Sequence, residues 1–164
     1  MSSDRIETYK RDLAFGAQAE ERKRRSKLIA RAEDLVWSDS ARHSGKSVSL
    51  VHPEKEFDVN TMMSFITEIP PGGATADHRH YTEAIIYILS GKGYSVIEGK
   101  KYEWKADDVI AVPTFVWHQH ANTDPDRPAR FLAVSNNPLM KSLAMYRMES
   151  SKEELRRLKE RGAL

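Results

Sequence analysis

The chain has 164 residues, 40% of them hydrophobic, with a formal net charge of +2. This size suffices for one packed domain with tails, and the weak charge argues against a nucleic-acid partner. The absence of cysteine excludes disulfides and thiolate metal sites. A polar N-terminus, and apolar runs that are all too short for a membrane span, predict a soluble cytoplasmic protein with no membrane partner.

Residues 4–34 are charge-dense and contain no proline, and their apolar residues recur at loosely helical spacing. We therefore expect one or two helices there, with the charged run at 20–25 as a solvated part. Residues 38–58 are polar and irregular, and they contain a predicted short strand at Val48–Val51. Residues 1–58 are accordingly predicted to form a helical and irregular N-terminal arm.

Short strand-like segments separated by turn signals begin near residue 60. The predicted strands are Met62–Ile69, Glu83–Leu89, Gly93–Glu98, Tyr102–Trp104, Val109–Val112, Val116–Asn122 and Arg130–Ser135. This rhythm is typical of an all-β antiparallel sandwich or barrel. We place the barrel domain at residues 59–140 and a helical tail at residues 141–164, where Ser150 and Ser151 each begin a capping box.

Two pairs of histidines lie on predicted strands. Residues i and i+2 of a strand share a face, so His78 and His80 point the same way, as do His118 and His120. A third imidazole from the second strand would complete a three-histidine face, which leaves metal positions open for a substrate or O₂. Alternation alone leaves open whether His118 or His120 supplies it, and a local twist or bulge would decide.

The first histidine strand continues into an apolar segment. Ile86 and Ile88 share the histidine face, whereas Arg79, Ile85 and Tyr87 take the other. Arg79 is therefore expected to make a surface or interface salt bridge away from the metal, and the alternative is a clamp on a substrate carboxylate. One face should line the barrel interior, and the other should pack on a helix or a second subunit. We accordingly predict a homodimer or a higher homo-oligomer.

The histidines belong to two spaced motifs that resemble those of the cupin superfamily. The matching residues are Gly72-x5-His78-x-His80, Gly91 and Pro113-x4-His118-x3-Asn122. The resemblance implies a double-stranded β-helix (jelly-roll) barrel with a divalent metal inside one end, held by His78, His80 and His118. Asp107 and Phe115 replace two usual glycines, and Ala84 stands where a glutamate ligand usually follows the histidines. Glu83 is one residue early and should point to the other face, and only an irregular strand would bring it to the metal as a ligand.

Loss of that glutamate, together with Trp-His-Gln-His at residues 117–120 and the stretch at residues 83–94, is similar to the gentisate 1,2-dioxygenase group. Known ring-cleaving members are generally bicupins of about twice this length, whereas this chain has room for one cupin domain. The similarity implies an iron(II) dioxygenase acting on a small hydroxylated aromatic or keto acid.

Other readings of the same residues stay open. Imidazole also suits zinc, nickel and manganese, so the ligands alone do not choose the metal. His120 is either a hydrogen-bond partner of the site or a catalytic acid/base that faces the substrate. The alternative functions are a non-oxidative metal cupin (an isomerase, lyase or decarboxylase) and a cupin that binds a small ligand without turnover.

Overall fold

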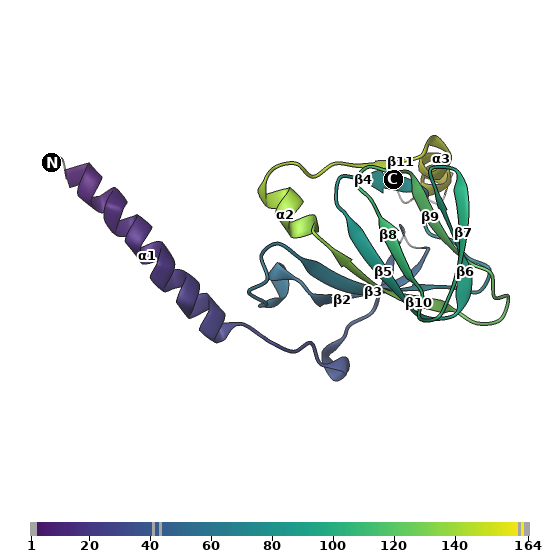
Figure 1. The fold of residues 1–164 in the computed structure, drawn as a ribbon, viewed down its shortest axis with the longest axis horizontal. Coiled ribbons are helices and arrows are strands. Elements are labelled where there is room, and N and C mark those ends of the chain that lie inside the picture. The colour runs from purple at the N-terminus through teal and green to yellow at the C-terminus, as the bar shows by residue number, and fades with distance from the viewer. Residues whose placement is uncertain (1–2, 41, 43, 161, 163–164) are drawn as a thin grey trace.

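The computed structural model describes residues 3–40, 42, 44–160 and 162 as a mostly β protein with two antiparallel sheets (Figure 1). The six-stranded sheet has the order β1 (Ser38–Ser40), β2 (Gly45–Val51), β3 (Met63–Ile69), β10 (Ala129–Ser135), β5 (Ala84–Ser90) and β8 (Val109–Val112). The five-stranded sheet has the order β11 (Met148–Ser150), β4 (His78–His80), β9 (His118–Asn122), β6 (Lys92–Ile97) and β7 (Lys100–Lys105). The predicted all-β jelly roll is confirmed.

Few helices accompany the sheets. They are α1 (Ser3–Arg25), α2 (Asn137–Ser142), α3 (Lys152–Glu160) and two 3-10 turns, η1 (Ala32–Asp34) and η2 (Pro53–Lys55). Before α3, the Ser151 hydroxyl accepts a hydrogen bond from the Glu154 N–H at 3.2 Å, as a capping serine does. Within the described part of the chain, no helix is long and apolar enough to cross a membrane.

The hydrophobic core lies between the two sheets. Its buried members are Ile69, Ile86, Ile88, Trp104, Val112, Ala129, Phe131 and Ala133. Strand β5 alternates as predicted: Ile86 and Ile88 are buried, whereas Ile85, Tyr87 and Leu89 remain exposed in the single chain. The inner face of this strand therefore lines the barrel, and its outer face has no cover from the described residues.

The N-terminal region differs in detail from the expected arm. One helix, α1, forms, and the short strand expected at Val48–Val51 is the longer β2, which pairs with β3 in the six-stranded sheet. Strand β2 lies near the edge of the sheet, because its outer neighbour β1 has only three residues. Polar side chains are compatible with a strand in that position. The division into residues 1–58, 59–140 and 141–164 stays a prediction. Strands β1 and β2, which lie within residues 1–58, belong to the six-stranded sheet.

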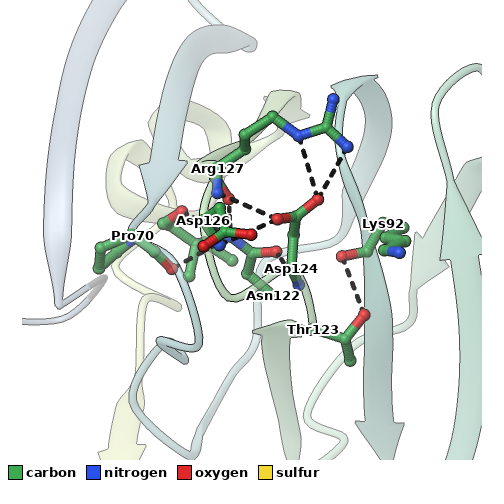
Figure 2. A network of polar contacts seen from close by, with 8 residues as sticks. Pro70, Lys92, Asn122, Thr123, Asp124, Asp126 and Arg127 are labelled. Carbon is green, nitrogen blue, oxygen red and sulfur yellow. Dashed lines mark hydrogen bonds and ion pairs between the residues drawn. The ribbon is translucent and has the colours of Figure 1, made fainter.

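The turn after β9 is held by one side-chain amide. Asn122 donates to the carbonyls of Ile69 (3.2 Å), Pro70 (3.1 Å) and Arg127 (2.8 Å), and its Oδ1 accepts from the Asp124 N–H (Figure 2). Asp124 in turn accepts from the Arg127 guanidinium at 3.0 Å. Hydrogen bonds, the largest from the Asp126 N–H, hold the pKa of Asp124 below its usual value. This network ties the end of β3 to the strand that carries His118 and His120.

Replacing Asn122 by alanine should destabilise the protein markedly. Asn122 is buried, and its loss leaves three carbonyls without this donor, which costs about 2–3 kcal/mol and lowers Tm by roughly 5–10 °C. Thermal unfolding followed by circular dichroism measures the shift. The matched control is Thr123→Ala, which removes only an exposed 3.4 Å hydrogen bond to Lys92. Equal shifts in both variants would contradict the structural role of the amide.

Candidate metal centre

Three histidines meet on the inner side of the five-stranded sheet. His78 and His80 point inward from β4, and His118 lies opposite His78 on β9. All three side chains are buried, and their potential ligand nitrogens lie within 4.8 Å of one another. Among the described residues, no other group of three or more metal-binding side chains comes together in this way. The cluster therefore contains no carboxylate.

Backbone carbonyls fix the tautomer of each ring. The Nδ1 atoms of His78, His80 and His118 lie 2.8, 2.7 and 2.9 Å from the carbonyl oxygens of Ala76, Thr82 and Val116. A carbonyl oxygen only accepts hydrogen bonds, so each Nδ1 must carry the proton. Each Nε2 then keeps the lone pair that a metal requires. The arrangement fits a divalent metal held by three neutral imidazoles.

The histidines are also held in the neutral state. Burial is the main cause that lowers the pKa of His78 to about 2 and that of His118 to about 4. Burial likewise lowers the pKa of His80. The positive charge of Arg42 lowers all three values further. No proton therefore competes with a metal at the three Nε2 atoms near neutral pH.

The metal-free protein should lose stability on mild acidification. An unfolded histidine takes up a proton below about pH 6.5, whereas folded His118 does so only near pH 4 and folded His78 only near pH 2. Between these values the unfolded chain binds more protons, so the free energy of unfolding falls as the pH falls. Urea unfolding of the apoprotein from pH 7.5 to 5 measures the slope. The His118→Gln variant should show a smaller slope, and an unchanged slope would contradict the assignment.

His120 differs from the three in its hydrogen bonding. The register places His120 opposite Ser95 on β6, and its Nδ1 lies 2.8 Å from the Ser95 hydroxyl. That hydroxyl also accepts from the Trp104 indole N–H at 3.1 Å. While it accepts from the indole, the Ser95 hydroxyl keeps a hydrogen of its own that it can donate to His120 Nδ1. With that donation a neutral His120 carries its proton on Nε2, unlike the other three rings.

The four histidines share one small cavity with the six-stranded sheet. Its apolar wall includes Phe65 from β3, Ile86 from β5 and Phe131 from β10, and its free volume is about 30 Å³. Ala84 also lines the cavity. It occupies the position at which the usual motif has a glutamate ligand. The space therefore has histidine on one side and hydrocarbon on the other.

Arg42 is a cavity residue that the sequence did not reveal. It lines the same cavity, and its Nη1 lies 3.8 Å from the Met148 sulfur on β11. Burial lowers the pKa of its guanidinium. No sequence pattern marked this residue, because it lies in the irregular segment before β2, far from both histidine motifs. Its carbonyl accepts from the Ala76 N–H at 2.7 Å, which places Arg42 next to the residues that lead into β4.

The two charged residues beside the first histidine motif both point elsewhere. Arg79 pairs with Glu149 of β11 at 2.6 Å, and its guanidinium lies over the rings of Phe115 and Trp117. The Glu83 carboxylate accepts from the Asn136 side-chain amide at 3.2 Å. Neither residue belongs to the histidine cluster. Strand alternation therefore gave the correct direction for both.

Comparison with protein families now identifies the fold. The family model described as a cupin domain matches residues 65–135. Residues 65–135 form a cupin domain. This range holds the three clustered histidines, His120 and Ala84, and it spans β3 to β10. The resemblance inferred from the two histidine motifs is confirmed.

Relatives of this cupin domain include named dioxygenases. A 5-aminosalicylate 1,2-dioxygenase from Comamonas is 34% identical over 80 residues, which is 49% of this chain and 21% of the relative. A gentisate 1,2-dioxygenase from Ralstonia is 35% identical over 82 residues, with the same two coverages. The chain therefore spans about a fifth of the length of these enzymes. An uncharacterised protein from Methanocaldococcus jannaschii is 37% identical over 71 residues, which is 43% of this chain and 56% of that protein.

Solved structures share the fold. A salicylate 1,2-dioxygenase from Pseudoaminobacter salicylatoxidans with gentisate superposes with a TM-score of 0.60 at 18% identity, covering 85% of this chain and 36% of the enzyme. A cupin-2 domain from Rhodospirillum rubrum superposes with a TM-score of 0.55 at 21% identity, covering 68% of this chain and 74% of the other. At these identities the likeness establishes the cupin fold.

Two departures from the usual cupin motif retain the backbone shape that glycine would allow. Asp107 and Phe115 stand at those positions, with φ angles of 71° and 57°. Non-glycine residues adopt this left-handed region at a cost of about 1–2 kcal/mol. The Phe115 ring contacts Tyr81 at a centroid distance of 4.3 Å and lies under the Arg79 guanidinium. These contacts offset part of the strain and connect β4 to the segment that leads into β9.

Proposed function

We propose that the protein is an iron(II) dioxygenase that acts on a small hydroxylated aromatic or keto acid. The observation that carries the proposal is the buried cluster of His78, His80 and His118, in which each Nδ1 bonds a carbonyl. Three ligands from one side leave positions for both a chelating substrate and O₂, as mononuclear iron oxygenases require. The dioxygenase names of the partial relatives support this choice.

In this proposal the Nε2 atoms of His78, His80 and His118 hold the metal. Bound iron(II) would supply open coordination positions and the redox chemistry for O₂, while its full 2+ charge attracts a chelating anion. The protein contributes neutral ligands, because burial keeps all three imidazoles unprotonated near pH 7. The hydrocarbon wall formed by Phe65, Ile86 and Phe131 excludes bulk water from the reacting atoms.

Arg42 supports an acid as the substrate. Arg42 lines the cavity, and its charge lowers the pKa of all three clustered histidines. A guanidinium presents two parallel N–H donors that match a carboxylate. We infer that Arg42 pairs with the carboxylate of the substrate.

His120 is proposed as the catalytic proton donor. In this proposal its Nδ1 accepts from Ser95, which leaves an Nε2–H that can donate to a substrate oxygen. The hydrogen bonds from Trp104 to Ser95 and between Ser95 and His120 hold the ring in position. A substrate hydroxyl or keto oxygen bound beside the three histidines would therefore meet a neutral donor rather than a fourth ligand.

The cavity volume restricts which atoms of the substrate enter. Its free volume of about 30 Å³ corresponds to about one water molecule, whereas a benzene-sized ring needs roughly 150 Å³. In the described conformation the cavity has no room for an aromatic ring beside the histidines, so binding of an aromatic acid requires the cavity to widen. The proposal therefore favours small acids whose carboxylate and hydroxyl are adjacent.

Oxygen uptake tests the proposed activity. Apoprotein loaded anaerobically with iron(II) should consume O₂ when gentisate, salicylate or 1-hydroxy-2-naphthoate is added, with loss of the aromatic absorbance. The His118→Ala protein treated in the same way is the control and should consume none above background. If the acids remain unchanged across the panel, or if turnover proceeds with zinc and without O₂, the dioxygenase proposal is wrong. The zinc result would instead favour Lewis-acid chemistry.

A further inference from the structure

Helix α1 stands clear of the barrel although it carries large apolar side chains (Figure 1). Ile6, Tyr9 and Leu13 are 46%, 65% and 62% exposed. Their spacing of three and four residues places them on one side of the helix. An isolated helix has little stability of its own in water, and most of its stability in proteins comes from packing an apolar side. The α1 stripe, defined as Ile6, Tyr9 and Leu13, therefore lacks the cover that such a helix needs.

Specific contacts hold the C-terminal end of α1 at a fixed place. The Ser26 hydroxyl accepts from the Asp58 N–H at 2.7 Å, and the Lys27 N–H donates to the Glu56 carbonyl at 2.9 Å. Arg22 on the last turns of α1 lies 3.8 Å from the Asp58 carboxylate. From this anchor α1 runs away from the barrel in Figure 1. Its stripe consequently does not contact the sheets of its own chain.

The six-stranded sheet has a matching uncovered surface, the outer apolar face, defined as Ile85, Tyr87, Leu89 and Val109. Ile85 is 58% exposed and Val109 is 62% exposed. The register places Tyr87 between Val109 of β8 and Leu132 of β10, so the apolar side chains form a continuous row across three strands. An exposed contiguous apolar patch of this kind marks an interaction surface.

We propose that α1 of one copy packs across the outer apolar face of a second copy, and that the second copy returns the same contact. A helix of 23 residues is about 35 Å long. A six-stranded sheet is about 24 Å wide at the usual strand spacing. One helix can therefore cross the whole face. Because each copy gives its helix to the other, the two copies form a closed dimer with two-fold symmetry.

The buried area agrees with a stable dimer. A helix of this length and about 10 Å width covers roughly 350 Å² of its partner. Two reciprocal helices then bury roughly 1,400 Å² in total, within the range of about 1,200–2,000 Å² for specific complexes. Reciprocity doubles the contact without requiring a second surface. The outer face of β5, which the sequence predicted to be covered, would then be covered by the partner copy.

The charges of α1 favour an apolar protein surface as its partner. Along its length, Lys10 pairs with Glu7 at 2.9 Å and Lys23 pairs with Glu20 at 2.7 Å. These pairs neutralise much of the charge within the helix, so neither an anionic membrane nor an acidic partner is needed to balance it. The apolar side chains of the α1 stripe still need a partner that covers them, and the outer apolar face is a surface of this chain that can do so.

Oligomeric state tests the contact. The full-length protein should be a dimer by size-exclusion chromatography with light scattering at micromolar concentration, and Leu13→Glu should raise its dissociation constant by at least tenfold. The matched control is Gln18→Glu, which adds the same charge about 140° round the helix and should remain dimeric. Unchanged circular dichroism of the barrel shows that Leu13→Glu still folds. A monomeric wild type, or equal effects of the two changes, would overturn the proposal.

Cross-linking identifies the two surfaces, because the native chain contains no cysteine. A mixture of Leu13→Cys protein and Ile85→Cys protein should form a disulfide-linked heterodimer under mild oxidation, whereas Gln18→Cys mixed with Ile85→Cys should not. Predominant Leu13–Leu13 linkage would mean that the helices pair with each other, and it would overturn the helix-on-sheet contact. This experiment is independent of metal and substrate, so its outcome does not depend on the proposed enzymatic function.

Discussion

Replacing His118 by alanine removes stoichiometric metal from the protein. Iron(II) or zinc bound to the wild type should be close to one ion per chain, and the affinity of the variant should fall by more than about 100-fold. The two imidazoles that remain both come from β4, so the ion loses its ligand from the second strand, β9. Metal content after dialysis, measured by inductively coupled plasma spectrometry, gives the stoichiometry. His78→Ala should behave in the same way.

A histidine outside the site provides the control for that experiment. His52 accepts a hydrogen bond from the Glu54 N–H before β3 and is not part of the cluster, so His52→Ala should keep its metal. Circular dichroism of the metal-free proteins establishes that all variants fold. Full retention of metal by a His78→Ala, His118→Ala double variant would show that the ion binds elsewhere.

Replacing Arg42 by glutamine weakens the binding of aromatic acids. Loss of a charge-assisted pair should raise the dissociation constant of salicylate or gentisate by roughly 10- to 100-fold. The basis is the placement of Arg42 in the histidine cavity, where its charge acts on all three rings. Isothermal titration of the zinc-loaded protein without turnover measures the affinity, so binding is separated from catalysis.

Two further variants separate the role of Arg42 from general effects of charge. Arg42→Lys keeps the positive charge and should retain part of the affinity, although lysine lacks the paired donors. Arg79→Gln removes an arginine that is bound to Glu149 outside the cavity and should bind the acids as the wild type does. If Arg79→Gln weakens binding as much as Arg42→Gln does, the carboxylate does not lie at Arg42.

The β-strands and the directions of their side chains followed from local patterns. Strand β8 has the predicted bounds Val109–Val112, and Ile86 and Ile88 face the core as alternation requires. Alternation also placed Arg79 and Glu83 away from the histidine cluster. These features depend on neighbours within a strand, whose geometry is nearly the same in every antiparallel sheet. The fold and the inward direction of all four histidines could therefore be predicted from the sequence.

The difference in hydrogen bonding between His118 and His120 required the tertiary structure. Both side chains point inward from β9 without a bulge, so alternation treats them alike. The difference comes from the neighbouring strands: His118 lies opposite His78 on β4, whereas His120 lies opposite Ser95 on β6. Their hydrogen bonds differ as well, because His118 Nδ1 lies 2.9 Å from the Val116 carbonyl oxygen, whereas His120 Nδ1 lies 2.8 Å from the Ser95 hydroxyl. Register between distant segments is a property of the folded sheet and leaves no local pattern.

The sequence by itself determined a cupin barrel with inward histidines, an alanine at the usual glutamate position and an apolar outer side on β5. Only the tertiary structure brought Arg42 to the histidines, because its position depends on contacts between segments far apart in the chain. It also showed that α1 and the outer apolar face are both uncovered in one copy. Local geometry is encoded by short-range periodicity, whereas the charge in a cavity and the cover of a surface depend on long-range packing.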